Sequence, residues 1–253
     1  MIISDKHRYL FVELPRTATT AIAKELRENY DGHSILYKHA TYEDFLRIAT
    51  DEQKKYFTFS CIRNPLDDVV SIYLKYRHNH RESFTSPNNL KRRDPFLRFF
   101  DRIKLKFTNN EGVEFSEFFL KYYHIPYNRW SELSHEKFNY IISFEKLQDD
   151  FGKALELIGL PQIRPLPATN KTTGDKKDYL SYYTPETINR AKRIFGPYMK
   201  KWGYSFPEIW GDSEVSWLNQ LAFRFFNMFR KAYWRWRANW RWRTGRVGRL
   251  TPE

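Results

Sequence analysis

The sequence predicts an α/β fold in which helices flank a central parallel sheet in three layers, with an amphipathic helix at the C-terminal end. Three observations predict it. Short apolar, aromatic segments alternate with segments of helical spacing, a pattern typical of a parallel sheet covered on both faces. The 253 residues are enough for one sizeable core. The last forty or so residues differ in composition from the rest, so we expect an α/β domain at residues 1–211 and a basic aromatic tail at 212–253.

The alternation can be followed along the chain. Strands are expected at residues 9–13, 34–37, 57–62 and 139–143. Helices are expected at residues 18–29, 43–48, 65–76, 95–106, 114–122, 149–157 and 185–195. Residues 78–94 are rich in Asn, Arg, Lys, Ser and Pro, and we predict a long loop there, of the kind that binds a variable partner.

The first strand is followed by polar groups suited to a phosphate. Its apolar run stops at Pro15, and a helix-forming stretch begins a few residues later. Between them stand one guanidinium and three hydroxyls, from Arg16, Thr17, Thr19 and Thr20. Together with the amides and the dipole of the helix start, these groups predict a site for a 5′-phosphate. Taken alone, the segment also fits an ordinary helix capped by Ser or Thr.

A second segment repeats this arrangement at residues 57–73. Asn64 can cap a helix, Pro65 suits its first position, and Arg63 then lies at the end of the preceding strand. Ser71 follows eight residues after Arg63. An arginine and a hydroxyl so placed can hold a second phosphate. Read alone, Arg63 also fits a surface ion pair and Ser71 a satisfied helix hydroxyl.

These segments resemble those of a known family. PRTATT, at residues 15–20, resembles the 5′-phosphosulfate loop of the sulfotransferases that use 3′-phosphoadenosine 5′-phosphosulfate (PAPS), and RNPLDDVVSIY, at residues 63–73, resembles their 3′-phosphate motif. YKHATYEDF is similar to the family's histidine-bearing segment, FEKL to its late strand-to-helix turn, and residues 170–206 to its closing region. The likeness spans residues 8–206 and is closest to the carbohydrate (heparan and chondroitin-type) branch.

The resemblance implies a P-loop-like sulfotransferase fold, PAPS as co-substrate, adenosine 3′,5′-bisphosphate (PAP) as product, no metal, and a saccharide or glycoconjugate acceptor. It also implies which residues contact the nucleotide: Pro15, Arg16, Thr17, Ala18, Thr19, Thr20, Arg63, Ser71, Lys171 and Thr172. His39 follows the second predicted strand and is our candidate general base, with Glu13 and Glu43 as alternatives. Arg16 is expected to neutralise charge on the leaving nucleotide.

Three positions depart from the family pattern. Arg16 replaces the usual lysine, Ala18 stands where glycine is common, and Asp68 stands where an arginine is common. The first replacement exchanges the compact ammonium charge of lysine for the planar guanidinium group of arginine. The third removes one phosphate contact from the second segment.

Two other functions fit parts of the sequence. A nucleotide kinase or other P-loop phosphotransferase would also need a phosphate loop, but the chain contains no GxxxxGK[ST] segment. An inactive adaptor for a membrane or a nucleic acid would keep the fold and bind no nucleotide. The seven histidines and the single cysteine show no zinc-type spacing, and Cys61 is expected in the core of a buried strand.

The tail carries a separate signal. Residues 215–252 hold nine Arg or Lys residues, no Asp or Glu, and five of the eight tryptophans. At helical spacing one apolar stripe emerges, formed by Leu218, Leu221, Ala222, Phe225, Phe229, Ala232, Trp236 and Trp240. We expect residues 215–250 to lie on an anionic membrane. Alternatively, the apolar stripe packs on the protein's own core or against a second copy in a homodimer. We do not expect the tail to bind nucleic acid.

The same features bear on location. The sequence has no charged-then-apolar leader and no apolar run long enough to span a bilayer, and one cysteine fits a reducing compartment. We therefore expect a cytoplasmic protein, peripheral on the inner face of a membrane.

Overall fold

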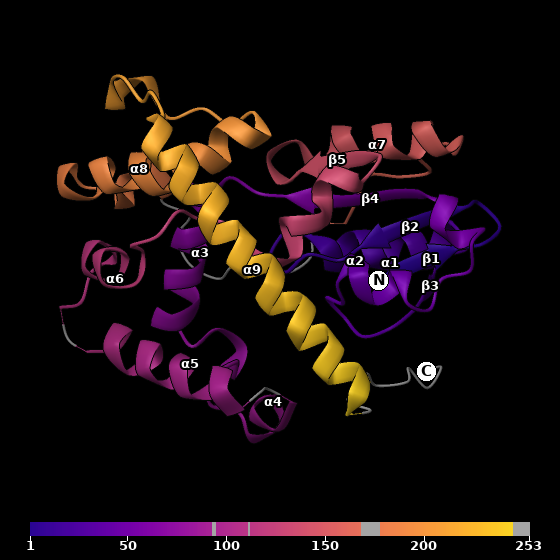
Figure 1. Ribbon diagram of the computed structural model, residues 1–253, viewed down its shortest axis with the longest axis horizontal. Coiled ribbons are helices and arrows are strands. Elements are labelled where there is room, and N and C mark those ends of the chain that lie inside the picture. Colours follow the sequence, from indigo (N-terminus) through magenta and orange to yellow (C-terminus); the bar gives the residue numbers. More distant parts are fainter. Residues whose placement is uncertain (93–94, 111, 168–177, 245–253) are drawn as a thin grey trace. The chain divides into compact units, whose positions relative to one another are not determined.

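The computed structural model describes residues 1–92, 95–110, 112–167 and 178–244 (Figure 1). The chain divides into two compact units. The first comprises Met1–Arg63, Asn128–Asn170 and Phe225–Glu253, and the second comprises Asn64–Tyr127 and Lys171–Arg224. The strands and the predicted phosphate loop belong to the first unit.

Within the described residues, the first unit contains one five-stranded sheet in the order β3, β1, β2, β4, β5. The strands are β1 (Ile2–Ser4), β2 (Tyr9–Val12), β3 (His33–Ser34), β4 (Phe57–Ile62) and β5 (Tyr140–Ser143). Strands β2, β4 and β5 run parallel, as predicted, whereas β1 is antiparallel to both β2 and β3.

The prediction of a wholly parallel sheet is therefore wrong at one edge. Strand β1 was not predicted, since its three residues, of which two are apolar, form too short a pattern to read as a strand. A polar turn at residues 5–8 reverses the chain, with Arg8 in the left-handed region at φ 55°, and pairs Ser4 with Tyr9 in a hairpin. A connection this short can join only antiparallel strands.

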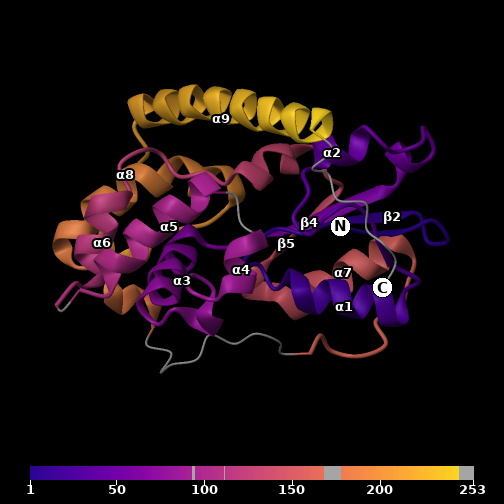
Figure 2. The same ribbon diagram turned by 90° about the horizontal axis from the view of Figure 1, so that it is seen from below.

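Both faces of the sheet are covered, which explains why its strands read as nearly continuous apolar runs. Tyr9 and Phe11 point to a core shared with α1 (Thr19–Asn29) and α7 (Leu147–Ile158). Leu10 and Val12 point to the opposite core, which includes Phe45 of α2 (Tyr42–Leu46). Figure 2 shows α1 and α7 together on one side of the strands and α2 on the other.

The second unit is helical in its described part. It contains α3 (Pro65–Arg77), α4 (Pro87–Arg92), α5 (Pro95–Thr108), α6 (Phe115–Tyr122) and α8 (Pro185–Trp202). Its core is strongly aromatic, and Trp202 and Trp210 pack against it. Asp68, the third departure from the family pattern, is fully buried and accepts a hydrogen bond from Tyr127 Oη at 2.8 Å.

The long loop predicted at residues 78–94 is partly helical. It contains a single 3-10 turn at His80–Glu82 and the short helix α4. Pro87 opens α4, because proline is preorganised for the first position of a helix. Helix α4 was not predicted because its residues are mostly polar and lack the apolar periodicity of the longer helices.

The tail forms the single long helix α9 (Trp217–Arg243), whose residues up to Arg224 belong to the second unit and from Phe225 onward to the first. Its final turns contact the first unit: Trp242 Nε1 donates to Asp44 Oδ1 at 2.9 Å, and the Arg241 guanidinium lies 4.4 Å from the centre of the Tyr37 ring. Among the described helices, none is both long and apolar enough to cross a membrane.

The core around β4 gives a direct test of the fold. Phe59 is fully buried, with its ring centre 5.1 Å from that of Phe11 and 6.0 Å from that of Tyr9. Phe59→Ala should lower the free energy of unfolding by about 3–5 kcal/mol, through lost burial and the cavity left behind. Urea denaturation measures the change. Ile163→Ala, at a side chain 62% exposed, is the matched control and should change stability little; equal effects would contradict the described core.

Candidate active site

The two predicted phosphate segments meet at the carboxyl ends of β2 and β4. The strands are parallel neighbours with Val12 opposite Ser60, and Ser60 Oγ donates a hydrogen bond to the Val12 carbonyl at 2.6 Å. Arg63 Nη1 then donates to the carbonyl oxygen of Arg16 at 3.2 Å. The Arg63 guanidinium, which is predicted to hold the second phosphate, is therefore anchored on the Arg16 loop, which is predicted to hold the first.

The backbone of the first loop is unusually shaped. Arg16 and Ala18 have φ values of 66° and 56°, in the left-handed region that favours glycine. This explains why glycine suits the position of Ala18. The hydroxyls of Thr17 and Thr19 both donate to the Leu14 carbonyl, at 3.0 and 3.1 Å, and hold the loop in this shape.

The start of α1 is open to a ligand. Ala18 is the N-cap residue and, in the described structure, provides no side-chain hydrogen bond to the first turn. The simpler reading of this segment, a helix capped by a threonine side chain, is therefore wrong. Amides at an uncapped helix start and the positive end of the helix dipole favour an anion.

A further cation lies beside this helix start. Lys38 Nζ donates to Thr20 Oγ1 at 3.2 Å, and both side chains are exposed. Sequence reasoning missed Lys38, although it precedes the candidate base directly in the histidine-bearing segment. The ammonium group therefore adds a positive charge beside Thr20, from a different loop.

His39 is held next to the same loop. Its Nδ1 lies 3.1 Å from the Glu13 carbonyl oxygen, so Nδ1 carries the proton and donates it, and Nε2 keeps its lone pair. The ring is partly buried, and burial lowers the pKa of His39 from 6.5 to about 4. At neutral pH the imidazole is therefore neutral and able to accept a proton at Nε2.

The alternative bases are engaged in the structure. The buried Glu13 carboxylate accepts a hydrogen bond from the Met1 nitrogen at 2.9 Å, and Glu43 accepts one from Ser134 Oγ at 2.6 Å. Glu13 and Glu43 are therefore each engaged by a hydrogen-bond donor, whereas His39 keeps a lone pair on Nε2.

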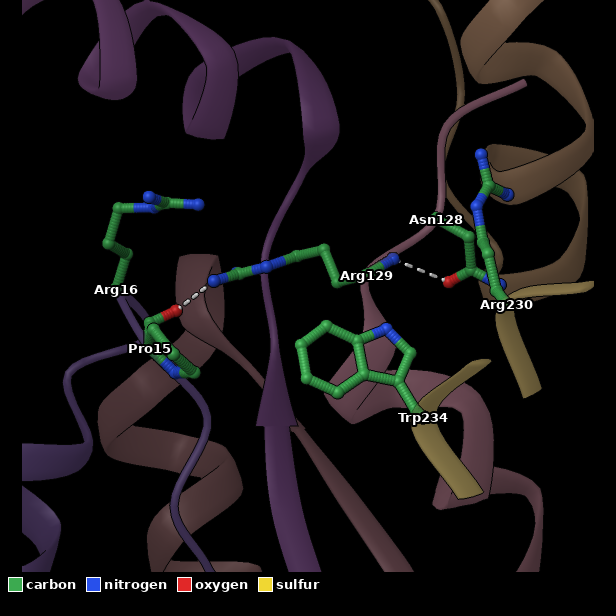
Figure 3. Close-up of a pocket in the computed structure, with 6 residues that line it drawn as sticks. All are labelled: Pro15, Arg16, Asn128, Arg129, Arg230 and Trp234. Atoms are coloured by element: carbon green, nitrogen blue, oxygen red, sulfur yellow. Dashed lines mark hydrogen bonds between the residues drawn. The ribbon is translucent and has the colours of Figure 1, made fainter. Parts of the chain in front are cut away.

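A pocket of about 340 Å³ opens beside the first loop (Figure 3). It is lined by Pro15, Arg16, Asn128, Arg129, Arg230 and Trp234, all in the first unit. Figure 3 shows the Arg129 side chain reaching across to the carbonyl oxygen of Pro15, to which its Nη2 donates. No acidic side chain is among these described lining residues, so the wall of the pocket is cationic.

Helix α9 is connected to this pocket by amide side chains. Asn227 Oδ1 accepts hydrogen bonds from Asn128 Nδ2 at 3.1 Å and from Arg230 Nη1 at 2.8 Å. Arg230 and Trp234 are one helical turn apart, so both project into the pocket from one face of the helix. Sequence reasoning did not place Arg129, Arg230 or Trp234 at the site, because no local pattern shows that residues 16, 129 and 230 meet.

The remaining predicted residues are distributed as follows. Ser71 is half-buried in the second turn of α3, in the second unit, and Lys171 and Thr172 lie outside the described residues. Cys61 is fully buried, and burial raises the pKa of its thiol well above the usual value, as expected of a core residue. In the described part of the chain, no group of three or more His, Cys, Asp or Glu side chains is arranged to hold a metal ion.

Comparison with known proteins gives one match. The sequence profile of the sulfotransferase family matches residues 1–205, which include β1 to β5 and every site residue proposed from the sequence. A search of the curated proteins and a search of the solved structures each found no match.

The site yields a prediction for Arg63. Arg63→Ala should weaken the binding of PAP by about 1.5–3 kcal/mol, roughly tenfold or more, because a charged contact to the 3′-phosphate is lost. Binding of adenosine 5′-phosphate should change less. Calorimetric titration compares the two ligands, with Arg27→Ala, on the exposed side of α1, as control. An equal loss for both ligands would remove Arg63 from the 3′-phosphate site.

Proposed function

The chain belongs to the sulfotransferase family, whose members are PAPS-dependent transferases, and we propose that this protein moves the sulfuryl group of PAPS to a hydroxyl group of an acidic saccharide. The observation that carries the proposal is the contact between Arg63 and the Arg16 carbonyl. This hydrogen bond joins the two segments that are predicted to bind phosphates, at one edge of the sheet and next to the neutral imidazole of His39.

The proposed nucleotide site uses both segments. The 5′-phosphosulfate would lie on the uncapped start of α1, against the loop formed by Pro15, Arg16, Thr17, Ala18, Thr19 and Thr20. The family resemblance assigns Arg63 to the 3′-phosphate and adds Ser71, Lys171 and Thr172 as nucleotide-binding residues. Helix-start amides and guanidinium groups together supply several charge-assisted hydrogen bonds.

In the proposed reaction, each of the nearby cations and the candidate base has one role. The acceptor oxygen attacks sulfur while the bond between sulfur and the 5′-phosphate oxygen breaks, and PAP leaves. The acceptor proton passes to His39 Nε2, the nitrogen with the available lone pair. Arg16 and Lys38 would offset the charge that develops on the departing phosphate. Both stand at the start of α1, so their charge is in place before the reaction.

The pocket supports the choice of acceptor. Trp234 offers an apolar face of the kind on which a sugar ring stacks, and Arg129 and Arg230 offer planar donors that match a carboxylate or sulfate. Asn128 adds an amide for hydroxyl groups. The combination favours an acidic saccharide over a neutral one, and the first loop forms one wall of the same pocket, so the acceptor would lie next to the donor sulfate.

The two rival functions make different binding predictions. A P-loop phosphotransferase would bind ATP with Mg²⁺ and discriminate little in favour of PAP, and an inactive adaptor would bind neither. The proposed function requires tight PAP binding that is independent of Mg²⁺. Titration of the full chain with PAP, and separately with ATP and Mg²⁺, decides among the three.

His39 gives a kinetic test. His39→Ala should leave PAP affinity nearly unchanged and lower kcat by roughly 10²–10⁴, because a general base acts in the transition state. Protonated His39 cannot accept a proton, so kcat/KM of the unmodified enzyme should fall as pH drops through about 4 and stay level near 6.5, the usual imidazole value. Sulfonate transfer measured against pH checks both. An acid limb centred near 6.5, or turnover retained within a fewfold in the variant, would contradict the assignment.

The acceptor site is tested by two matched pairs on one helix. Arg230→Ala and Trp234→Ala should each raise the KM for an acidic saccharide, by roughly tenfold, since a charged hydrogen bond or a stacking surface is lost. Arg235→Ala and Trp236→Ala change the same residue types at exposed positions outside the pocket and should leave KM unchanged. PAP affinity should be the same in all four. Equal KM values within a pair would remove that α9 residue from the acceptor site.

A further inference from the structure

Helix α9 exposes its apolar side chains to solvent. From the point where α9 enters the first unit, the exposed fractions are 52% for Phe225, 58% for Met228, 54% for Phe229, 44% for Tyr233, 62% for Trp236 and 37% for Trp240. Spacings of three and four residues place these six side chains on one face of the helix. We call this set the outer stripe. Exposed apolar residues scattered singly are ordinary, but a continuous row of six large ones marks an interaction surface.

The opposite face of the same helix contacts the protein. Asn227 and Ala238 are buried at 9% and 5% exposure, and Arg230 and Trp234 line the pocket. Asp44 and Tyr37 of the first unit hold its C-terminal turns. The outer stripe therefore cannot turn toward the first unit without breaking these contacts, which argues against packing on the core of that unit as its role.

Basic side chains border the outer stripe. Arg224, Lys231, Arg235 and Arg243 are exposed, and residues 215–252 contain no Asp or Glu. In Figure 2, the C-terminal end of α9 lies on the side of the sheet that also carries α2. An apolar row flanked by cations and without compensating acids complements a surface that is apolar inside and anionic at its boundary.

We propose that the outer stripe of α9 binds the surface of an anionic lipid bilayer, with Phe229, Trp236 and Trp240 inserted at the boundary between headgroups and acyl chains and Lys231 and Arg235 on the lipid phosphates. The helix lies in the plane of the surface, because it is too polar to cross it. A second copy of the chain fits less well, since pairing two outer stripes would bring two rows of arginine and lysine together.

The experiment is sedimentation of the full chain with phosphatidylcholine vesicles, with and without phosphatidylserine. We expect strong binding only with phosphatidylserine, and release as salt rises, because screening weakens the electrostatic part of the attraction. Phe229→Ser combined with Trp236→Ser should lower the partition coefficient by roughly tenfold. Trp234→Ser, which alters the inner face, should leave it unchanged.

A charge-matched pair isolates the basic border. Lys231→Glu with Arg235→Glu should reduce binding by roughly tenfold or more, whereas Lys24→Glu with Arg27→Glu on α1 changes the net charge equally and should have little effect. PAP affinity is measured in each variant and reports whether the first unit is folded. It also distinguishes a failure of the membrane proposal from a failure of the proposed sulfotransferase function.

Three results would overturn the proposal. The first is a full chain that ignores anionic vesicles. The second is equal loss of binding in the two charge-reversed pairs, which would show a net-charge effect with no contribution from α9. The third is a concentration-dependent dimer in sedimentation velocity that Phe229→Ser with Trp236→Ser converts to monomer, which would assign the outer stripe to a second copy.

Discussion

The parallel pairing of β2 with β4 is the constraint on which the rest of the first unit depends. It sets Val12 beside Ser60, so the chain leaves both strands at the same edge of the sheet. The two loops that follow therefore begin within reach of each other, and Arg63 bonds to Arg16. A shift of one residue in this register would turn every side chain of one strand to the opposite face and separate the two guanidinium-bearing loops.

Much of the fold could be predicted from the sequence because periodicity is a local signal. Strand β4 agrees with the prediction at both ends, and α1 and α3 differ from it by one residue. Pairing direction is not local. The hairpin between β1 and β2 depends on neighbours in space and was missed. The strand predicted at residues 34–37 is present only as the two-residue β3 (His33–Ser34), which pairs antiparallel with β1. Helix α4 was missed because its residues lack an apolar face.

The candidate site shows the same division. Arg16, Arg63 and His39 were predicted because each lies in a continuous motif. A hydrogen bond links Arg63 to the Arg16 carbonyl, and another places His39 beside Glu13. Lys38, Arg129 and Arg230 were not predicted. Arg129 and Arg230 reach the pocket from segments with no motif of their own, and Lys38 lies in the histidine-bearing segment but was given no role there. Propensity also misread the start of α1: its threonines bond to Leu14, and an alanine in a left-handed conformation takes the capping position.

Helix α9 carries two surfaces on one rigid element, and this restricts how its length can change. Each residue advances the helix by a fixed rotation, so inserting a single residue after Asn227 would swing Arg230 and Trp234 out of the pocket and turn the outer stripe sideways by the same angle. Inserting seven residues, close to two whole turns, would nearly restore the phase of the following side chains. Natural variants of this protein should therefore exchange one large apolar residue for another along the outer stripe, while insertions and deletions within the helix should be rare and close to whole turns in length.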